Sequence, residues 1–434
     1  MSDAVVITGM GAVLAGGAGR DALRRALAEP AKPVATEPGK GYHRPGDPRR
    51  FLSAGEVDLT PWLSPRAARR MSVPSRFATA AAKMAVEDAG LDPARLGEET
   101  TAVALATAFG TARFAEHLIQ AILEQGPEAA SPFHFSESVA NAPAAQVSIA
   151  LGATGAQVAV TQREAGPLLA VVLGARELRR RRARYALVGA TDEVNPLVHA
   201  ILARFRALAG GHGRPEIARP FDRDRDGLLA AEGSAVLLLE RAEDAAQRGA
   251  TVLARVEAWE RGFDPTAPSW GFGAGATELA ARLRAGLARQ GIDPGSIDAV
   301  VASAAGTRGG DAQEAALLRQ LFGGEPPPVL APKGAVGEYG GGQLAAAVLH
   351  QLFGADPPPV LAPKGAVGEY GGGQLAAAVL AAAGQTFPTA GFETADPALG
   401  LTPHDGSPLP PPKRVLVSAL ATGGSAAWVV LGAP

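Results

Sequence analysis

The sequence contains no cysteine among its 434 residues. This absence excludes disulfides, thiolate metal ligands and thiol nucleophiles, because each of them needs a cysteine sulfur atom. Aromatic residues are also few, at 5% of the chain. Hydrophobic residues make up 47% and charged residues 19%, which is the composition of a globular protein that buries a large core without cross-links.

Long apolar runs and an excess of positive charge are also missing. The longest apolar runs, residues 345–349 and 376–383, are far shorter than the roughly 20 residues that cross a bilayer, so we expect no membrane association. A formal net charge of -2 predicts no polyanion-binding surface and therefore no nucleic-acid partner. Residues 1–8 place an acid before a short apolar run, unlike a secretory signal. We therefore expect a cytoplasmic protein.

Short β-type runs alternate with helical segments along the chain, which predicts a layered α/β fold. Phe77, Ala81, Met84 and Ala89 have helical spacing and precede Gly90, so they predict a helix that is buried on one side and ends at this glycine. No long polar linker divides the chain, and we expect two similar halves, residues 1–250 and 251–434, packed as one unit. The predicted strands are residues 4–8, 157–160, 185–188, 235–239, 299–302, 414–418 and 428–431.

Residues 326–349 recur letter for letter as residues 357–380, at an offset of 31. A solenoid needs at least three copies that differ at surface positions. Two identical copies indicate a recent duplication or an artefact of the sequence, and we expect only one copy to be required for function.

Three motif-like segments predict no cofactor or metal site. Residues 222–227 begin like a calcium loop, but the twelfth position, which needs a bidentate glutamate, is Gly233. Residues 9–14 follow a strand without the third glycine of a dinucleotide site, and we interpret them as a strand-to-helix turn. Lys333 and Lys364 follow no glycine-rich phosphate loop, and the seven histidines show no metal-ligand spacing.

The arginine run at residues 179–182 comes at the end of a predicted helix. Cations are favourable at a helix C-terminus and point to solvent there. The alternative is a docking patch for an acidic carrier protein, because charge complementarity speeds such encounters.

Segments along nearly the whole chain resemble the β-ketoacyl synthases, the condensing enzymes of fatty acid and polyketide synthesis. The most specific segment reads Ala218-Arg-Pro-Phe-Asp-Arg-Asp-Arg-Asp-Gly227. The resemblance implies a thiolase-like layered αβαβα fold made of two similar halves. The other segments that carry it are residues 5–11, 80–90, 131–135, 139–149, 231–240, 305–307, 333–342 and 421–426.

The catalytic residues of that family are missing from this sequence. Active members use a cysteine at a strand-to-helix turn, within Thr-x-Cys-x-x-Gly, and this chain has residues 160–167, Val-Thr-Gln-Arg-Glu-Ala-Gly-Pro. Alignment of the downstream helix places Glu164 at the nucleophile, and a slip of one residue places Arg163 there. Neither side chain can form an acyl thioester.

Both family histidines are also replaced. The His-Gly-Thr motif begins here with Ala305, and the Lys-x-x-x-Gly-His motif ends with Glu338 in the first copy of the repeat or Glu369 in the second. The spacing from Ala305 favours Glu338, and the spacing to residues 421–424 favours Glu369. Residues 421–424, Ala-Thr-Gly-Gly, lack the phenylalanine of the family's gating loop.

The resemblance implies a chain length factor, an inactive subunit that pairs with an active ketosynthase, meets the acyl carrier protein through that complex and shapes the tunnel for the growing chain. Two rival functions remain open: a malonyl carrier-protein decarboxylase, and a scaffold that only stabilises its partner. Glu164 as a general base of raised pKa is a further alternative. The candidate tunnel or interface residues are Phe109, Thr111, Phe114, Phe133, His134, Phe135, Asn195, Pro196 and Leu197.

Overall fold

A computed structural model describes residues 4–36, 41–336 and 388–434 of the chain. In these residues an 11-stranded sheet has the order β11-β10-β12-β13-β9-β1-β8-β7-β5-β6, with β2 paired to β1, and β3 and β4 form a separate two-stranded sheet. The strands are β1 (Val5–Leu14), β2 (Gly17–Ala18), β3 (Val34–Ala35), β4 (Arg50–Phe51), β5 (Thr101–Ala106), β6 (Gln157–Val160), β7 (Tyr185–Asp192), β8 (Gly233–Arg241), β9 (Ala254–Phe263), β10 (Ala299–Val301), β11 (Val329–Leu330), β12 (Arg414–Leu420) and β13 (Ser425–Gly432).

The two ends of this sheet repeat one topology. Strand β5 pairs in parallel with β6 and β7, as β10 does with β11 and β12. The antiparallel pairs β7/β8 and β8/β1 correspond in the same way to β12/β13 and β13/β9. A short pairing between β1 and β9 joins the two groups.

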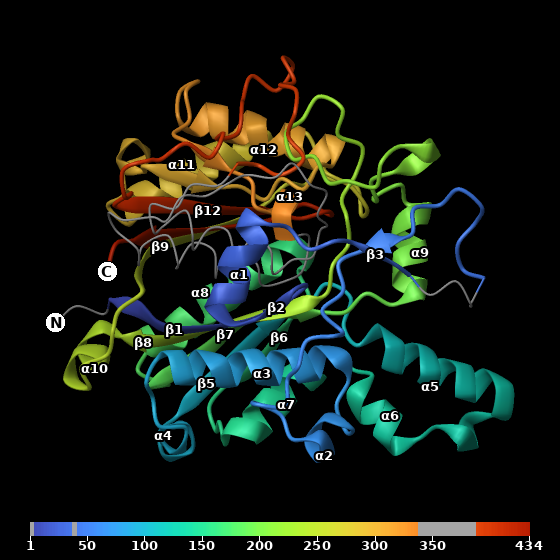
Figure 1. Ribbon diagram of the computed structural model, residues 1–434. Coiled ribbons are helices and arrows are strands. Elements are labelled where there is room, and N and C mark those ends of the chain that lie inside the picture. Colours follow the sequence, from blue (N-terminus) through green and yellow to red (C-terminus); the bar gives the residue numbers. More distant parts are fainter. Residues whose placement is uncertain (1–3, 37–40, 337–387) are drawn as a thin grey trace.

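Helices and strands form five layers (Figure 1). Helices α1 and α8 lie between the two strand groups, α3 and α7 cover the outer face of the first group, and α11 and α12 cover that of the second. The predicted αβαβα fold of two similar halves is therefore confirmed. The helices are α1 (Gly19–Ala28), α2 (Pro65–Ala68), α3 (Val73–Asp88), α4 (Ala94–Glu98), α5 (Ala112–Gln125), α6 (Pro132–Glu137), α7 (Ala142–Leu151), α8 (Gly166–Arg179), α9 (Pro196–Arg204), α10 (Ala242–Gln247), α11 (Ala276–Arg289), α12 (Arg308–Leu321) and α13 (Lys333–Val336).

Successive strand residues supply separate cores, because side chains alternate between the two faces of a strand. In β8, Leu237 packs into the core around α1 and α8, and Leu238 packs into the outer core around α3. In β12, Val417 and Leu416 make the same division between the middle core and the core around α11 and α12. No helix in the described part of the chain is long and apolar enough to cross a membrane.

The predicted strands coincide with β1, β6, β7, β8, β10, β12 and β13, but the turn predicted at residues 9–14 is wrong. These residues continue β1 to Leu14. A Cβ atom at Gly9 or Gly11 would lie 2.0 Å from a backbone oxygen of α3. The two glycines therefore allow helix α3 to approach the strand closely, and they do not turn the chain.

The helix predicted around Phe77 is confirmed as α3, but its burial differs from the prediction. Eleven of its residues are buried, so it is covered on more than one side. It packs against β1 and β8 on one face and against α7 on another. The predicted end at Gly90 holds, since this glycine has φ +58, a conformation that favours glycine.

Candidate functional site

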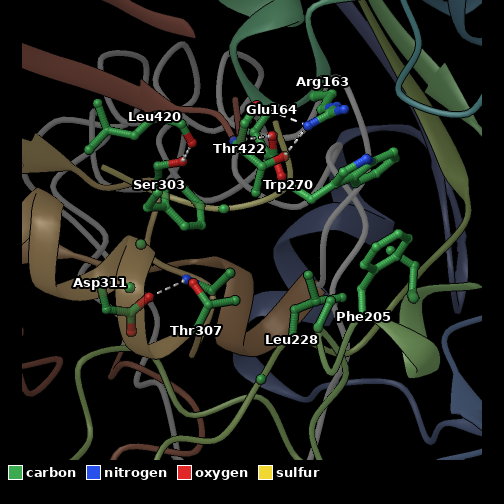
Figure 2. Close-up of a pocket in the computed structure, with 18 of the residues that line it drawn as sticks. Arg163, Glu164, Phe205, Leu228, Trp270, Ser303, Thr307, Asp311, Leu420 and Thr422 are labelled. Atoms are coloured by element: carbon green, nitrogen blue, oxygen red, sulfur yellow. Dashed lines mark hydrogen bonds between the residues drawn. The ribbon is translucent and has the colours of Figure 1, made fainter. Parts of the chain in front are cut away.

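A cavity of about 390 Å³ lies where residues from both halves of the chain meet (Figure 2). The turn before α8 supplies Arg163 and Glu164, and the start of α12 supplies Thr307 and Asp311. Lys333, from the first copy of the repeat, lines it as well. The second copy, with Lys364 and Glu369, lies outside the described residues, and so does Glu338.

The chain makes a sharp turn between β6 and α8. Arg163 has φ +48, a left-handed backbone conformation that is unfavourable for a residue with a side chain. A Cβ atom at Gly166, the first residue of α8, would lie 2.9 Å from the Cβ of Ala106, so the helix starts close against β5. This turn places the Arg163 side chain at the cavity, at the N-terminus of α8.

Arg163 connects the two halves across the mouth of the cavity. Its Nη1 donates to the Ser269 carbonyl (2.9 Å) and to the Thr422 carbonyl and hydroxyl (3.1 and 2.9 Å). The guanidinium carbon lies 4.2 Å from the centre of the Trp270 ring, and Trp270 stacks on Phe205 with ring centres 4.8 Å apart (Figure 2). Cation–π contact and ring stacking thus hold these three side chains together.

The residues beside Arg163 bind the same part of the second half. Glu164 accepts the Thr422 N–H (3.2 Å), and the Gln162 amide oxygen accepts the Ser425 hydroxyl (2.8 Å). Three successive residues therefore fix the turn between β12 and β13. Both candidates for the nucleophile position, Arg163 and Glu164, lie at the cavity.

The inner end of the cavity contains buried ionisable groups. The Asp311 carboxylate accepts the N–H of Ala305 (3.1 Å), one of the predicted degenerate positions. Glu314 accepts the N–H of Ser303 (2.8 Å), and Lys333 Nζ donates to the Ser303 hydroxyl (3.4 Å). Lys333 is only 1% exposed.

Burial raises the pKa of Asp311 to about 6 and that of Glu314 to about 7. Hydrogen bonds from the backbone oppose both shifts, and the charge of Lys333 also opposes the shift of Glu314. Such carboxyls can exchange protons near neutral pH. The lining of this cavity, within the described residues, includes neither cysteine nor histidine. The cavity can therefore bind a ligand or move a proton, but it offers no thiol or imidazole.

Of the predicted tunnel residues, Phe109 lines this cavity. Its N–H donates to Asp192 at the end of β7 (3.1 Å), which fixes the segment after β5. Phe114, Phe133 and His134 instead form a cluster of rings between α5 and α6, with centres 5.6–5.7 Å apart. Phe135 points to solvent with 63% of its surface exposed.

The remaining tunnel candidates lie at the starts of helices. Thr111 is buried at the N-cap of α5. Asn195 is fully buried, caps α9 by accepting the Val198 N–H (2.8 Å) and donates to Glu116 on α5 (3.0 Å). The next two residues, Pro196 and Leu197, begin α9, and none of these four lines the cavity.

Several residues of this cavity were not predicted from the sequence. Asp311 and Glu314 are three residues apart, so a helix predicted after Ala305 places both side chains on one face, and this spacing could have identified them. Phe205, Trp270 and Phe272 come from loops or a helix end, where spacing gives no periodic signal. They come together only in the folded chain.

The arginine run lies at the C-terminal end of α8, as predicted. Arg181 pairs with Glu243 (2.7 Å), Arg182 lies 3.9 Å from Glu177, and Arg179 covers the Trp259 ring. The cavity is at the opposite end of this 14-residue helix, roughly 20 Å away at 1.5 Å per residue. These contacts favour a stabilised helix end over a docking patch that serves the cavity.

Replacing Glu193 by glutamine is expected to stabilise the protein at pH 8 but not at pH 4. Burial raises the pKa of this carboxyl to about 7, although the carboxyl accepts a hydrogen bond from the backbone N–H of Arg113 (2.9 Å), which lowers the pKa. The pKa of this carboxyl is near 4.5 in the unfolded chain and about 7 in the folded chain. The raised pKa therefore stabilises the fold at a pH below 4.5, and this stability is lost as the pH rises through 7. We expect Glu193→Gln to gain about 2 kcal/mol at pH 8 relative to pH 4 in urea unfolding. Glu128→Gln, on the surface, is the control, and equal pH profiles of both variants would contradict the assignment.

Comparisons with known proteins agree with this geometry. The model of "Beta-ketoacyl synthase, N-terminal domain" matches residues 2–245, and that of "Beta-ketoacyl synthase, C-terminal domain" matches residues 271–355. The tetracenomycin polyketide synthase ketoacyl synthase alpha subunit of Streptomyces glaucescens is 31% identical over 333 residues, covering 74% of this chain and 76% of that protein. The 3-oxoacyl-[acyl-carrier-protein] synthase 2 of Synechocystis is 31% identical over 277 residues, covering 62% of this chain and 66% of that protein.

Two solved structures resemble the chain over its whole length. The ishigamide ketosynthase/chain length factor has a TM-score of 0.82 at 25% identity, and the coverage is 99% of both chains. A type II polyketide synthase acyl-carrier protein in complex with its ketosynthase bound to the hexaketide has a TM-score of 0.81 at 23% identity, again with 99% coverage of both chains. The second likeness concerns the fold alone.

Proposed function

The chain belongs to the beta-ketoacyl synthase family, and we propose that within it the chain is a catalytically inactive chain length factor. In this role it pairs with an active ketosynthase and shapes the tunnel into which the growing chain extends. One observation supports the proposal most strongly. The turn that presents the nucleophilic cysteine in active members of the family presents an arginine here, and the chain contains no cysteine.

Arg163 is the better candidate for the nucleophile position. A sharp turn between a strand and a helix exposes one side chain over the helix N-terminus, and here the residue with the left-handed backbone is Arg163. Glu164, the position favoured by the downstream alignment, follows it within a short helical turn. An arginine side chain at this position forms no acyl thioester.

The surface beside β6 supports the pairing. Strand β6 is at the end of the sheet and pairs only with β5 among the described strands, so one row of its backbone groups is available to another chain. Apolar side chains are exposed on β6, on α7, which contacts β6, and on residues 133–139 before α7, which is typical of an interface rather than of a free surface. They are Phe133, Phe135, Val139, Ile149 and Val158.

Replacing Phe133 by alanine is expected to lengthen the products of the reconstituted pair. Phe133 packs against Phe114 and His134 and is 39% exposed, so its ring can border a tunnel at the interface. A smaller side chain leaves room for further two-carbon units. Mass analysis of the products measures the effect, and Phe263→Ala, on β9, is the control. If alanine variants of Phe114, Phe133 and His134 all give products of the same length as the unchanged chain, these residues do not line the tunnel.

The proposed function is tested by co-expression with a cysteine-bearing ketosynthase encoded near this chain. We expect a stable complex of the two chains that extends acyl groups held on the acyl carrier protein, and no extension by this chain alone. Formation of carbon–carbon bonds by the isolated chain would refute the proposal. A complex whose products do not respond to any interface variant would instead favour the scaffold.

A decarboxylase is the second candidate, because Glu314 and Lys333 are buried together at the inner end of the cavity. A cation near a malonyl thioester can stabilise the enolate that forms when carbon dioxide leaves, and a carboxyl can return the proton. Release of carbon dioxide from malonyl carrier protein by the purified chain, and its loss in Lys333→Met, would establish this activity.

A further inference from the structure

The described residues of the chain leave this cavity open although no cysteine lines it. Its volume of about 390 Å³ lies within the range of small-molecule sites, roughly 300–1,000 Å³. Large apolar side chains surround it: Phe109, Leu202, Phe205, Leu228, Trp270, Phe272 and Leu420. Aromatic walls favour a planar ligand, since stacked rings gain energy beyond the area that they bury.

A glycine at the start of α12 makes room for one of these walls. A Cβ atom at Gly310 would lie 2.8 Å from the ring of Phe272, so only glycine allows the ring to lie against the helix. At the mouth, Trp270 and Phe205 stack on each other with an angle of 10° between their rings. The cavity is thus bounded by flat surfaces both at its mouth and along α12.

The polar groups of the cavity favour a partly negative oxygen. Lys333 lies at the inner end, and the N-termini of α8 and α12, which carry partial positive charge, border the same space. The N-cap side chain of α12, Thr307, makes no capping hydrogen bond. Five acidic residues of the lining offset the charge of four basic ones, so a carbonyl or a single carboxylate suits the site better than a polyanion. The acids are Glu164, Asp192, Asp226, Asp311 and Glu314, and the bases are Arg163, Arg206, Arg308 and Lys333.

We propose that this cavity is a non-covalent binding site for a planar conjugated carbonyl compound. The ring or polyene system lies against Phe205, which Trp270 holds in place, and against Phe272, and a carbonyl oxygen points toward Lys333. No bond forms or breaks in this step. The site does not depend on the pairing proposed above, because all the residues that form it belong to this chain.

The test is calorimetric titration of the purified full chain, without any partner, with anthraquinone-2-carboxylate. We expect saturable binding of one ligand per chain. Decanoate, which has the same carboxylate on a flexible saturated tail, is expected to bind at least about tenfold more weakly. Equal binding of both ligands would overturn the preference for planar compounds, and no saturable binding of either would overturn the site.

Variants locate the ligand. Phe205→Ala is expected to weaken the binding of anthraquinone-2-carboxylate at least about tenfold, because it removes a stacking surface, and Trp270→Ala is expected to do the same, because it removes the ring that holds Phe205 in place. Both residues are more than half exposed, so the fold tolerates the change. Phe135→Ala, an exposed ring that does not line the cavity, is the matched control and keeps full affinity. An equal loss of affinity in all three variants would show that the ligand does not bind in this cavity.

The repeated sequence offers a second control. Lys333 and Lys364 have identical neighbours over the 24 repeated residues, and the described cavity contains Lys333. Lys333→Met is expected to weaken the ligand at least about tenfold, and Lys364→Met to leave it unchanged. An unchanged affinity in Lys333→Met would overturn the assigned orientation of the carbonyl. Because these measurements need no ketosynthase, failure of the pairing leaves their outcome unaffected.

Discussion

A chain with Phe135 replaced by glutamate is expected not to bind the proposed ketosynthase partner while it keeps its own fold. Phe135 lies on α6, which packs against α7, the helix that contacts β6, and 63% of its surface is exposed, so the isolated chain gains little from it. In a pair, a carboxylate at this place would be buried without a partner charge. Central aromatic residues often dominate interface energies, and we expect pairing to weaken at least about 100-fold.

The matched control for this prediction is Phe263→Glu. Phe263 has the same exposed fraction, 63%, but it ends β9 in the other half of the chain. Co-purification and light scattering measure how tightly each variant pairs with the ketosynthase. They show whether the loss depends on the position of the new carboxylate or only on its charge. If Phe135→Glu pairs as tightly as Phe263→Glu, the edge beside β6 is not the interface.

The fold was predictable because most strands are short apolar runs, and family-like segments extend along nearly the whole chain. Strand β9 was missed because it is not a continuous apolar run, although Arg255 and Glu257 alternate with apolar residues in the period of two that is typical of a half-buried strand. Strand β5, Thr-Ala-Val-Ala-Leu-Ala, is rich in alanine, which favours helices. Burial in the sheet decides the conformation of β5, and burial cannot be read from local sequence.

The position of the site was predictable, but its details were not. Motif spacing located the turn at residues 160–167. The alignment of the segment from α8 to β7 could shift by one residue, so Arg163 and Glu164 remained alternatives. The backbone angle of Arg163, which sequence does not give, favours one of them. Asn195 was chosen as a tunnel residue because it follows the β7 turn, although its amide is used to cap α9 and bind Glu116.

The turn before α8, which contains no cysteine, connects the two halves of the chain at the cavity. Gln162, Arg163 and Glu164 each bind the turn at residues 422–425, so the segment that would carry a reactive group in an active enzyme here links the halves. Without a cysteine, this turn cannot hold an acyl chain as a thioester. A preserved cavity with a fixed mouth is consistent with a protein that acts through its shape.

Replacing Gly11 by alanine is expected to unfold or severely destabilise the protein. The added Cβ atom would lie 2.0 Å from the carbonyl oxygen of Ala81 in α3, far below any tolerated contact. Helix α3 is held between β1, β8 and α7, so it cannot move away without opening the core. We expect a loss of about 4 kcal/mol or more in urea unfolding, or no soluble protein.

The control for Gly11→Ala is the same change at Gly97 in α4, where the new Cβ atom would lie 3.5 Å from its nearest neighbour. Alanine favours helices over glycine by about 1 kcal/mol, so Gly97→Ala should be neutral or stabilising. If Gly11→Ala gives no soluble protein, Gly9→Ala, which meets the oxygen of Ala85 at 2.0 Å, should fail in the same way. A Gly11→Ala chain that unfolds within about 1 kcal/mol of the parent would show that α3 does not need this close approach.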